Sequence, residues 1–78
     1  MLHQEFLHEM EDILEASPGS LTGGEALDDC PAWDSLAILS FTLLAQEKAG
    51  CEVPAREVRS AHTVDDLYRL VESVRAEG

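Results

Sequence analysis

Residues 33–49 read W-D-S-L-A-I-L-S-F-T-L-L-A-Q-E-K-A and form the most apolar stretch of the chain. The length of this stretch and its many good helix formers favour a helix over a strand. We therefore predict a helix over residues 35–49, which ends at Gly50 because glycine is the usual residue after a helix C-terminus. Apolar residues occupy nearly every side of this helix, which predicts a central element packed by neighbours on several sides.

The segment before this helix is predicted to be a long connection over residues 17–34. It contains Ser-Pro-Gly-Ser and Gly23-Gly24, which are typical of loops, and a short turn is expected around residues 24–28. Loops of this length tend to be functional or mobile. Earlier still, residues 2–16 repeat apolar side chains at helical spacing and predict a first helix. The residues expected to hold the loop on the core are Leu21, Leu27 and Cys30.

Two further helices are predicted after Gly50. Pro54 suits the first position of a short helix over residues 54–60. Thr63-Val-Asp-Asp resembles a capping box and opens a final helix. No segment is typical of a strand. We therefore expect an all-α fold, a small four-helix bundle with a long loop between the first two helices and a short third helix, in one domain over residues 1–78. The apolar face of the final helix is predicted to be Val64, Leu67, Tyr68, Val71 and Val74.

The charge of the chain is strongly acidic, with a net charge of −11 over 78 residues. Residues 1–47 contain ten acidic residues and no Lys or Arg. Such a surface repels phosphate backbones, so we expect no nucleic-acid partner, and it attracts basic proteins. A simpler interpretation is that the acidity only keeps a small protein soluble.

Cys30 and Cys51 are too few and wrongly spaced for a zinc site or a C-x-x-C redox pair. We interpret them as two reduced thiols that serve as small apolar residues in a cytoplasmic protein. No apolar run approaches the length of a membrane span, so we expect no membrane partner. We expect no metal site, because the acidic loop with Asp28, Asp29 and Asp34 lacks the spacing of a calcium loop. We also expect the protein to be a monomer.

Asp34 and Ser35 stand where the loop meets the central helix. Either side chain suits the helix N-cap, and capping alone explains a lone Asp-Ser pair. If Asp34 is the cap, the Ser35 hydroxyl is left free and exposed. A nucleophilic role for Ser35 needs a neighbouring base, and no Gly-x-Ser-x-Gly motif surrounds it. The candidate bases are His3, His8 and His62, and the sequence places none of them beside Ser35. We therefore expect no catalytic residues.

Three short motifs occur at fixed offsets in the second half of the chain. They are Asp34-Ser35-Leu36, followed by the long apolar helix, then Cys-Glu-Val-Pro at 51–54 and Thr-Val-Asp-Asp-Leu at 63–67. With these motifs, residues 27–74 resemble an acyl carrier protein. The first helix and the long loop agree with this family in length and acidity but carry no diagnostic motif.

The resemblance implies that Ser35 is the attachment point of 4′-phosphopantetheine, flanked by Asp34 and Leu36. A separate phosphopantetheinyl transferase would move this group from coenzyme A with magnesium, so the chain itself is not an enzyme. The thiol of the group would hold an acyl thioester for acyl-loading and acyl-accepting enzymes. Leu36 would contact such partners or pack at the base of the arm, with ordinary core packing as the alternative.

The chain departs from the fatty-acid carriers in its central helix. In that family the helix displays several acids, whereas here Glu47 is its only acid after Asp34. Trp33 is also distinctive, and we expect it to pack the loop onto the bundle rather than to face partners. These departures favour a specialised bacterial pathway, polyketide-like or single-acyl transfer. The alternatives are a fatty-acid carrier, an aminoacyl or peptidyl carrier, and an unmodified acidic helical adaptor.

Overall fold

Four α-helices and two shorter helical segments make up the computed structural model, which describes the backbone of residues 2–77. Within these residues the only strand-like pairing is an isolated antiparallel bridge between Ala26 and Thr63. The predicted all-α fold, with its long loop and short third helix, is therefore confirmed. The α-helices are α1 (His3–Leu14), α2 (Ser35–Leu44), α3 (Ala55–Ser60) and α4 (Val64–Glu77); the short segments are a 3₁₀ turn, η1 (Leu27–Asp29), and a π-helical turn, η2 (Ala45–Ala49).

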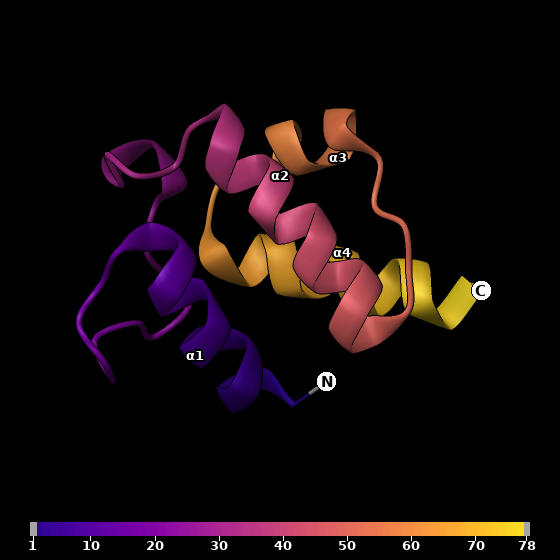
Figure 1. The fold of residues 1–78 in the computed structure, drawn as a ribbon, viewed down its shortest axis with the longest axis horizontal. Helices are drawn as coiled ribbons and strands as arrows, with labels where there is room; N and C mark the ends of the chain where they lie inside the picture. Colours follow the sequence, from indigo (N-terminus) through magenta and orange to yellow (C-terminus); the bar gives the residue numbers. More distant parts are fainter. Residues whose placement is uncertain (1, 78) are drawn as a thin grey trace.

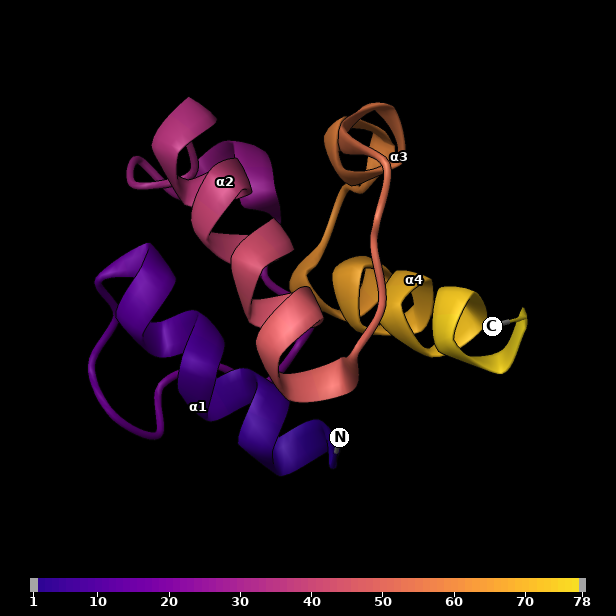
Figure 2. The same ribbon diagram turned by 45° about the vertical axis from the view of Figure 1, so that its right-hand side comes forward.

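The helices α1 and α2 lie side by side and run in opposite directions (Figures 1 and 2). Helix α4 packs against α1 and against η2, which continues α2. The short α3 contacts both α2 and α4 and so bridges these two helices. The long loop enters α2 at one end of the bundle (Figure 1), and Ser35 is the first residue of this helix.

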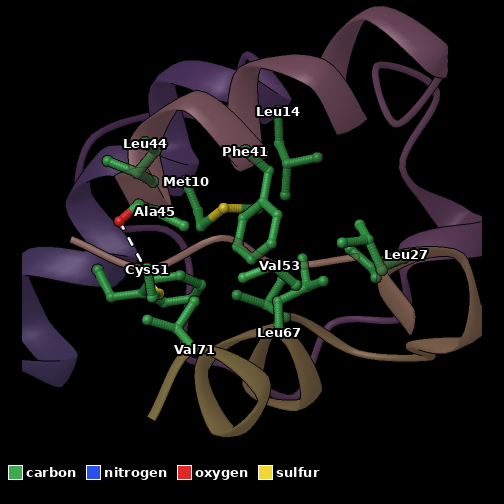
Figure 3. Packing of buried hydrophobic residues seen from close by; sticks show 13 residues of the cluster. Met10, Leu14, Leu27, Phe41, Leu44, Ala45, Cys51, Val53, Leu67 and Val71 are labelled. Carbon is green, nitrogen blue, oxygen red and sulfur yellow. Dashed lines mark hydrogen bonds between the residues drawn. The ribbon is translucent and has the colours of Figure 1, made fainter. Parts of the chain in front are cut away.

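The core is largely aliphatic around the ring of Phe41 (Figure 3), and it also contains Phe6. Phe6 of α1 and Phe41 of α2 are both completely buried, and their rings meet edge to face with centroids 6.2 Å apart. Burial of each such side chain contributes about 1.5–3 kcal/mol to folding. Helix α4 adds three of its predicted face residues to the buried cluster, and Tyr68 and Val74 pack against it; the three are Val64, Leu67 and Val71.

Several helix ends follow local sequence signals. Thr63 Oγ1 accepts the Asp66 N–H at 3.2 Å, and Asp66 Oδ2 accepts the Thr63 N–H at 3.1 Å, which confirms the capping box. Gly50 has a φ of 66° and ends η2, as expected. The predicted helical position of Pro54 is wrong by one residue, because its ψ of 134° is extended and α3 begins at Ala55.

The end predicted for the first helix is also wrong. Helix α1 ends at Leu14 rather than residue 16, because Glu15 adopts a left-handed conformation with a φ of 56°. Beyond this end, the buried carboxylate of Glu11 holds the start of the loop. Its Oε2 accepts the Gly19 N–H at 2.8 Å and the Leu21 N–H at 3.4 Å, so loop amides supply the partners that a buried charge requires.

The middle of the loop is fixed to the start of α4 by backbone hydrogen bonds. The Leu27 N–H donates to the His62 carbonyl at 2.8 Å, and the Asp65 N–H donates to the Gly23 carbonyl at 2.8 Å. The Asp65 side chain also lies 2.7 Å from Nε2 of His3. This contact joins the first turn of α1 to the first turn of α4, although the two residues are 62 positions apart in the sequence.

Two carboxylates at this junction make the fold sensitive to acid. Partial burial acts to raise the pKa of Glu25, but the N–H groups of Thr22 and Gly23 outweigh it and hold this pKa below its ordinary value of 4.5. The N–H groups of His62 and Thr63 likewise hold the pKa of Asp66 below 3.8. A lowered folded-state pKa stabilises the fold above the ordinary value, and that stability is lost as the pH falls through the folded-state pKa.

We therefore expect the urea midpoint to fall as the pH drops below about 4.5. In Glu25→Gln the fall should be shallower, because the substituted amide does not titrate. Urea titrations at pH 6 and pH 3.5 measure both slopes. Glu5→Gln, which alters an exposed carboxylate of α1, should keep the wild-type slope. Equal slopes for all three proteins would contradict the assignment to Glu25.

Candidate functional site

The N-terminus of α2 is capped by Asp34, and Ser35 is its first helical residue. Asp34 Oδ1 accepts the Ala37 N–H at 2.9 Å, and its backbone carbonyl accepts the Ile38 N–H at 2.9 Å. Ser35 is exposed, and its hydroxyl has no hydrogen-bond partner within the described chain. Of the two capping assignments, the one with Asp34 as the cap is correct. Capping therefore leaves the Ser35 hydroxyl without a structural role.

Trp33 fixes the direction in which the loop enters α2. Its N–H donates to the Cys30 carbonyl at 3.0 Å, and its ring meets the buried Phe41 ring edge to face, with centroids 6.4 Å apart. The side chain is half-buried against the core. This geometry confirms that Trp33 packs the loop onto the bundle. Trp33 therefore lies against the core, whereas Ser35, two residues later, is exposed.

Leu36 follows Ser35 and is 70% exposed, so the alternative of ordinary core packing is wrong and the side chain is an exposed apolar group. It begins a row on the outer face of α2, which continues at Leu39 and Leu43, 53% and 48% exposed. These residues are three and four positions apart and so share one side of the helix. Neighbours pack α2 on several sides, as expected, through α1 and α3, but this side is left uncovered. We call these three residues the leucine row.

A shallow groove of about 530 Å³ lies between the end of α1 and the start of α2. It includes both neighbours of Ser35, Asp34 and Leu36. Carboxylates come to it from Asp12 and Glu15 as well as from Asp34, and its remaining lining is largely apolar: Ile13, Pro31, Ala32, Ala37 and Ser40. The sequence did not single out the α1 residues, because acids on an amphipathic helix usually mark only its solvated face.

No histidine is placed to activate Ser35. His3 pairs with Asp65, and His8 lies 3.6 Å from the Glu11 carboxylate. His62 is exposed in the turn before α4, where its N–H donates to Asp66. Among the side chains that the structure describes, no group of three or more His, Cys, Asp or Glu is arranged to hold a metal ion. Ser35 thus presents an exposed hydroxyl with no histidine base beside it in the described chain.

Both cysteines are free thiols, as expected. Cys51 is buried in the core, and Cys30 is half-buried with its Sγ 3.4 Å from the Ala26 carbonyl. Burial raises the pKa of the Cys30 thiol, and the charges of Glu25 and Asp29 raise it further. Because the thiolate is the reactive form, the Cys30 side chain is not set up as a nucleophile at neutral pH.

Comparisons with known proteins give one distant similarity. An acyl carrier protein of Rhodococcus erythropolis is 25% identical over 69 residues, which cover 88% of this chain and 76% of the relative. No family model matches the chain, and no solved structure matches it. The relative is named as a carrier, which agrees with the expectation that the chain is not an enzyme. The similarity supports a carrier role in general.

None of the helices in the described chain combines the length and the apolar character that crossing a membrane requires.

Proposed function

We propose that this chain is an acyl carrier protein whose Ser35 carries 4′-phosphopantetheine. The observation that carries the proposal is the exposed hydroxyl at the first residue of α2, which has no partner because Asp34 caps the helix. The resemblance in the three sequence motifs and the distant relative support the same role. When bound, the group supplies a thiol that holds an acyl chain as a thioester.

The residues at this position fit such a group. The first N–H groups of a helix lack intrahelical acceptors, and the helix dipole favours negative charge there, so a phosphodiester on Ser35 is electrostatically suited to this end. Asp34 occupies the N–H of Ala37 and leaves the earlier N–H groups available. Leu36, with most of its surface exposed, lies beside the attachment point as an apolar contact for the arm or for a partner enzyme.

The attachment step needs a separate phosphopantetheinyl transferase. The Ser35 oxygen forms a bond to the phosphorus that carries the pantetheine arm of coenzyme A. The pyrophosphate bond breaks at that phosphorus, adenosine 3′,5′-bisphosphate leaves, and the hydroxyl proton passes to the transferase or to water. The chain supplies an accessible oxygen and a fixed helix end. A base within the chain is not required, which agrees with the histidine positions.

We further propose a specialised, polyketide-like pathway in the cytoplasm, with a monomeric carrier that meets acyl-loading and acyl-accepting enzymes in turn. The support is the composition of α2 and η2, where Glu47 is the only acid, so that apolar contact has a larger share in recognition than in fatty-acid carriers. A fatty-acid carrier and an aminoacyl or peptidyl carrier are the alternative assignments. The mass of the thioester recovered from the native host distinguishes these cargoes.

The test of the carrier function is the intact mass of the chain after incubation with coenzyme A, Mg²⁺ and a transferase of broad carrier range. We expect a gain of one phosphopantetheine group, located on the peptide that contains Ser35 by fragmentation. If the folded chain gains no mass while a known carrier in the same tube is fully modified, the proposal fails. The unmodified acidic adaptor then becomes the better assignment.

A further inference from the structure

The leucine row and the acidic end of α1 adjoin each other beside Ser35. We propose that they form one docking surface for a partner enzyme that presents apolar side chains to the leucine row and Lys or Arg side chains to Asp12 and Glu15. This proposal rests on the carrier function, because the partner is an enzyme that acts at Ser35. It places the charged half of the recognition surface on α1 rather than on α2.

The apolar half is the uncovered side of α2. Leu36, Leu39 and Leu43 expose between about half and 70% of their surfaces along one side of the helix. Scattered exposed leucines are ordinary on protein surfaces, but a contiguous row is typical of an interaction site. Because the row starts directly after Ser35, an enzyme that reaches the hydroxyl meets Leu36 first.

The acidic residues beside the leucine row indicate the charge of the partner's surface. Asp12 and Glu15 line the groove that also contains Leu36, and neither forms an ion pair within the described residues. No Lys or Arg precedes Lys48, so the first half of the chain offers these carboxylates no compensating cation. Complementary charge at an interface raises the association rate and excludes wrong partners. A partner with a basic border is therefore the matching occupant.

Glu15 also violates two local preferences of its own position. It has a φ of 56°, a conformation in which glycine is favoured, and the Ala16 N–H to Glu11 carbonyl bond around it is typical of a glycine-ended helix. In addition, its charge stands at the negative end of the helix dipole, and no basic residue occupies the last turn of α1. Residues that break local rules without local compensation are expected at functional sites. Nothing within the fold accounts for a glutamate here, whereas a basic partner does.

Glu15→Gly separates function from stability because the two should change in opposite directions. We expect the melting temperature to rise by roughly 5 °C, since the strain and the unfavourable charge are both removed. At low ionic strength, kcat/KM for phosphopantetheine transfer should fall about three- to tenfold. The difference from wild type should shrink in about 0.5 M salt, where the Debye length is short. Loss of activity in a more stable protein is not explained by unfolding.

Asp12→Asn is a second test that keeps the helix and removes the other carboxylate, and it should lower kcat/KM in the same salt-dependent way. The matched control is Glu52→Gln, which changes the net charge equally at an exposed residue beyond the opposite end of α2 and should transfer at the wild-type rate. If wild type is modified but both α1 variants match it at low salt, the docking surface is overturned while the carrier function stands. If wild type is not modified, the carrier function itself fails.

Discussion

Ser35→Ala is expected to abolish phosphopantetheine attachment completely while the melting temperature stays within about 2 °C of wild type. The loss is complete because the substitution removes the only oxygen that the proposed modification uses. The fold is unaffected because the Ser35 hydroxyl has no partner in the described chain, and the cap of α2 is the carboxylate of Asp34. Alanine is also compatible with the first turn of a helix.

Intact mass and thermal unfolding of the same samples measure both expectations. The matched control is Ser40→Ala, which removes a hydroxyl that lines the same groove, from the same helix, and should be modified like wild type. A mass gain in Ser35→Ala would contradict the assignment. Attachment at a residue other than Ser35 in the wild-type chain would contradict it as well. A large drop in melting temperature would show that Ser35 has a structural role.

Phe41→Ala is expected to cause the largest loss of stability, about 3–5 kcal/mol. Phe41 is completely buried, and it receives edge-to-face contacts from both Phe6 and Trp33. Such ring contacts add about 0.5–1.5 kcal/mol to the burial term. Because small domains have only about 5–15 kcal/mol of total stability, much of the folding free energy would be lost. The melting temperature should fall by about 20 °C.

Leu39→Ala is the matched control for this loss, since it shortens a large apolar side chain of the same helix at a position that is 53% exposed. Its melting temperature should change by less than about 4 °C. Urea or thermal unfolding followed by far-ultraviolet circular dichroism compares the two variants. Similar shifts in both would mean that the centre of the core lies elsewhere than at Phe41.

Elements defined by neighbouring residues could be predicted from the sequence. The Thr63 capping box, the end at Gly50 and the apolar face of α4 depend on spacings of a few residues, and the structure confirms them. The side of α2 that faces outward could not be predicted in this way. Its apolar residues occur on all sides of the helix, so their spacing does not indicate which side is buried. The exposure of the leucine row depends instead on where α1, α3 and α4 pack.

The candidate site was predictable only where it is continuous in the sequence. Asp34 and Ser35 are adjacent, and their capping arrangement was one of two that the residues allow. The groove beside them needs Asp12 and Glu15, which are about 20 residues earlier and reach it only through the packing of α1 on α2. One local signal was available for Glu15, namely an acid at the end of a helix, where a cation or glycine is preferred.

The fastening of the long loop to the start of α4 has a consequence for the time at which this protein matures. The segment that leads to Ser35 is held by the carbonyl of His62 and the N–H of Asp65, more than 25 residues further along the chain. A ribosome-bound fragment that ends before these residues contains the whole Asp-Ser-Leu motif but lacks the groups that bind the loop before α2. The loop that leads to Ser35 should therefore reach its folded conformation only after α4 has begun to emerge during synthesis.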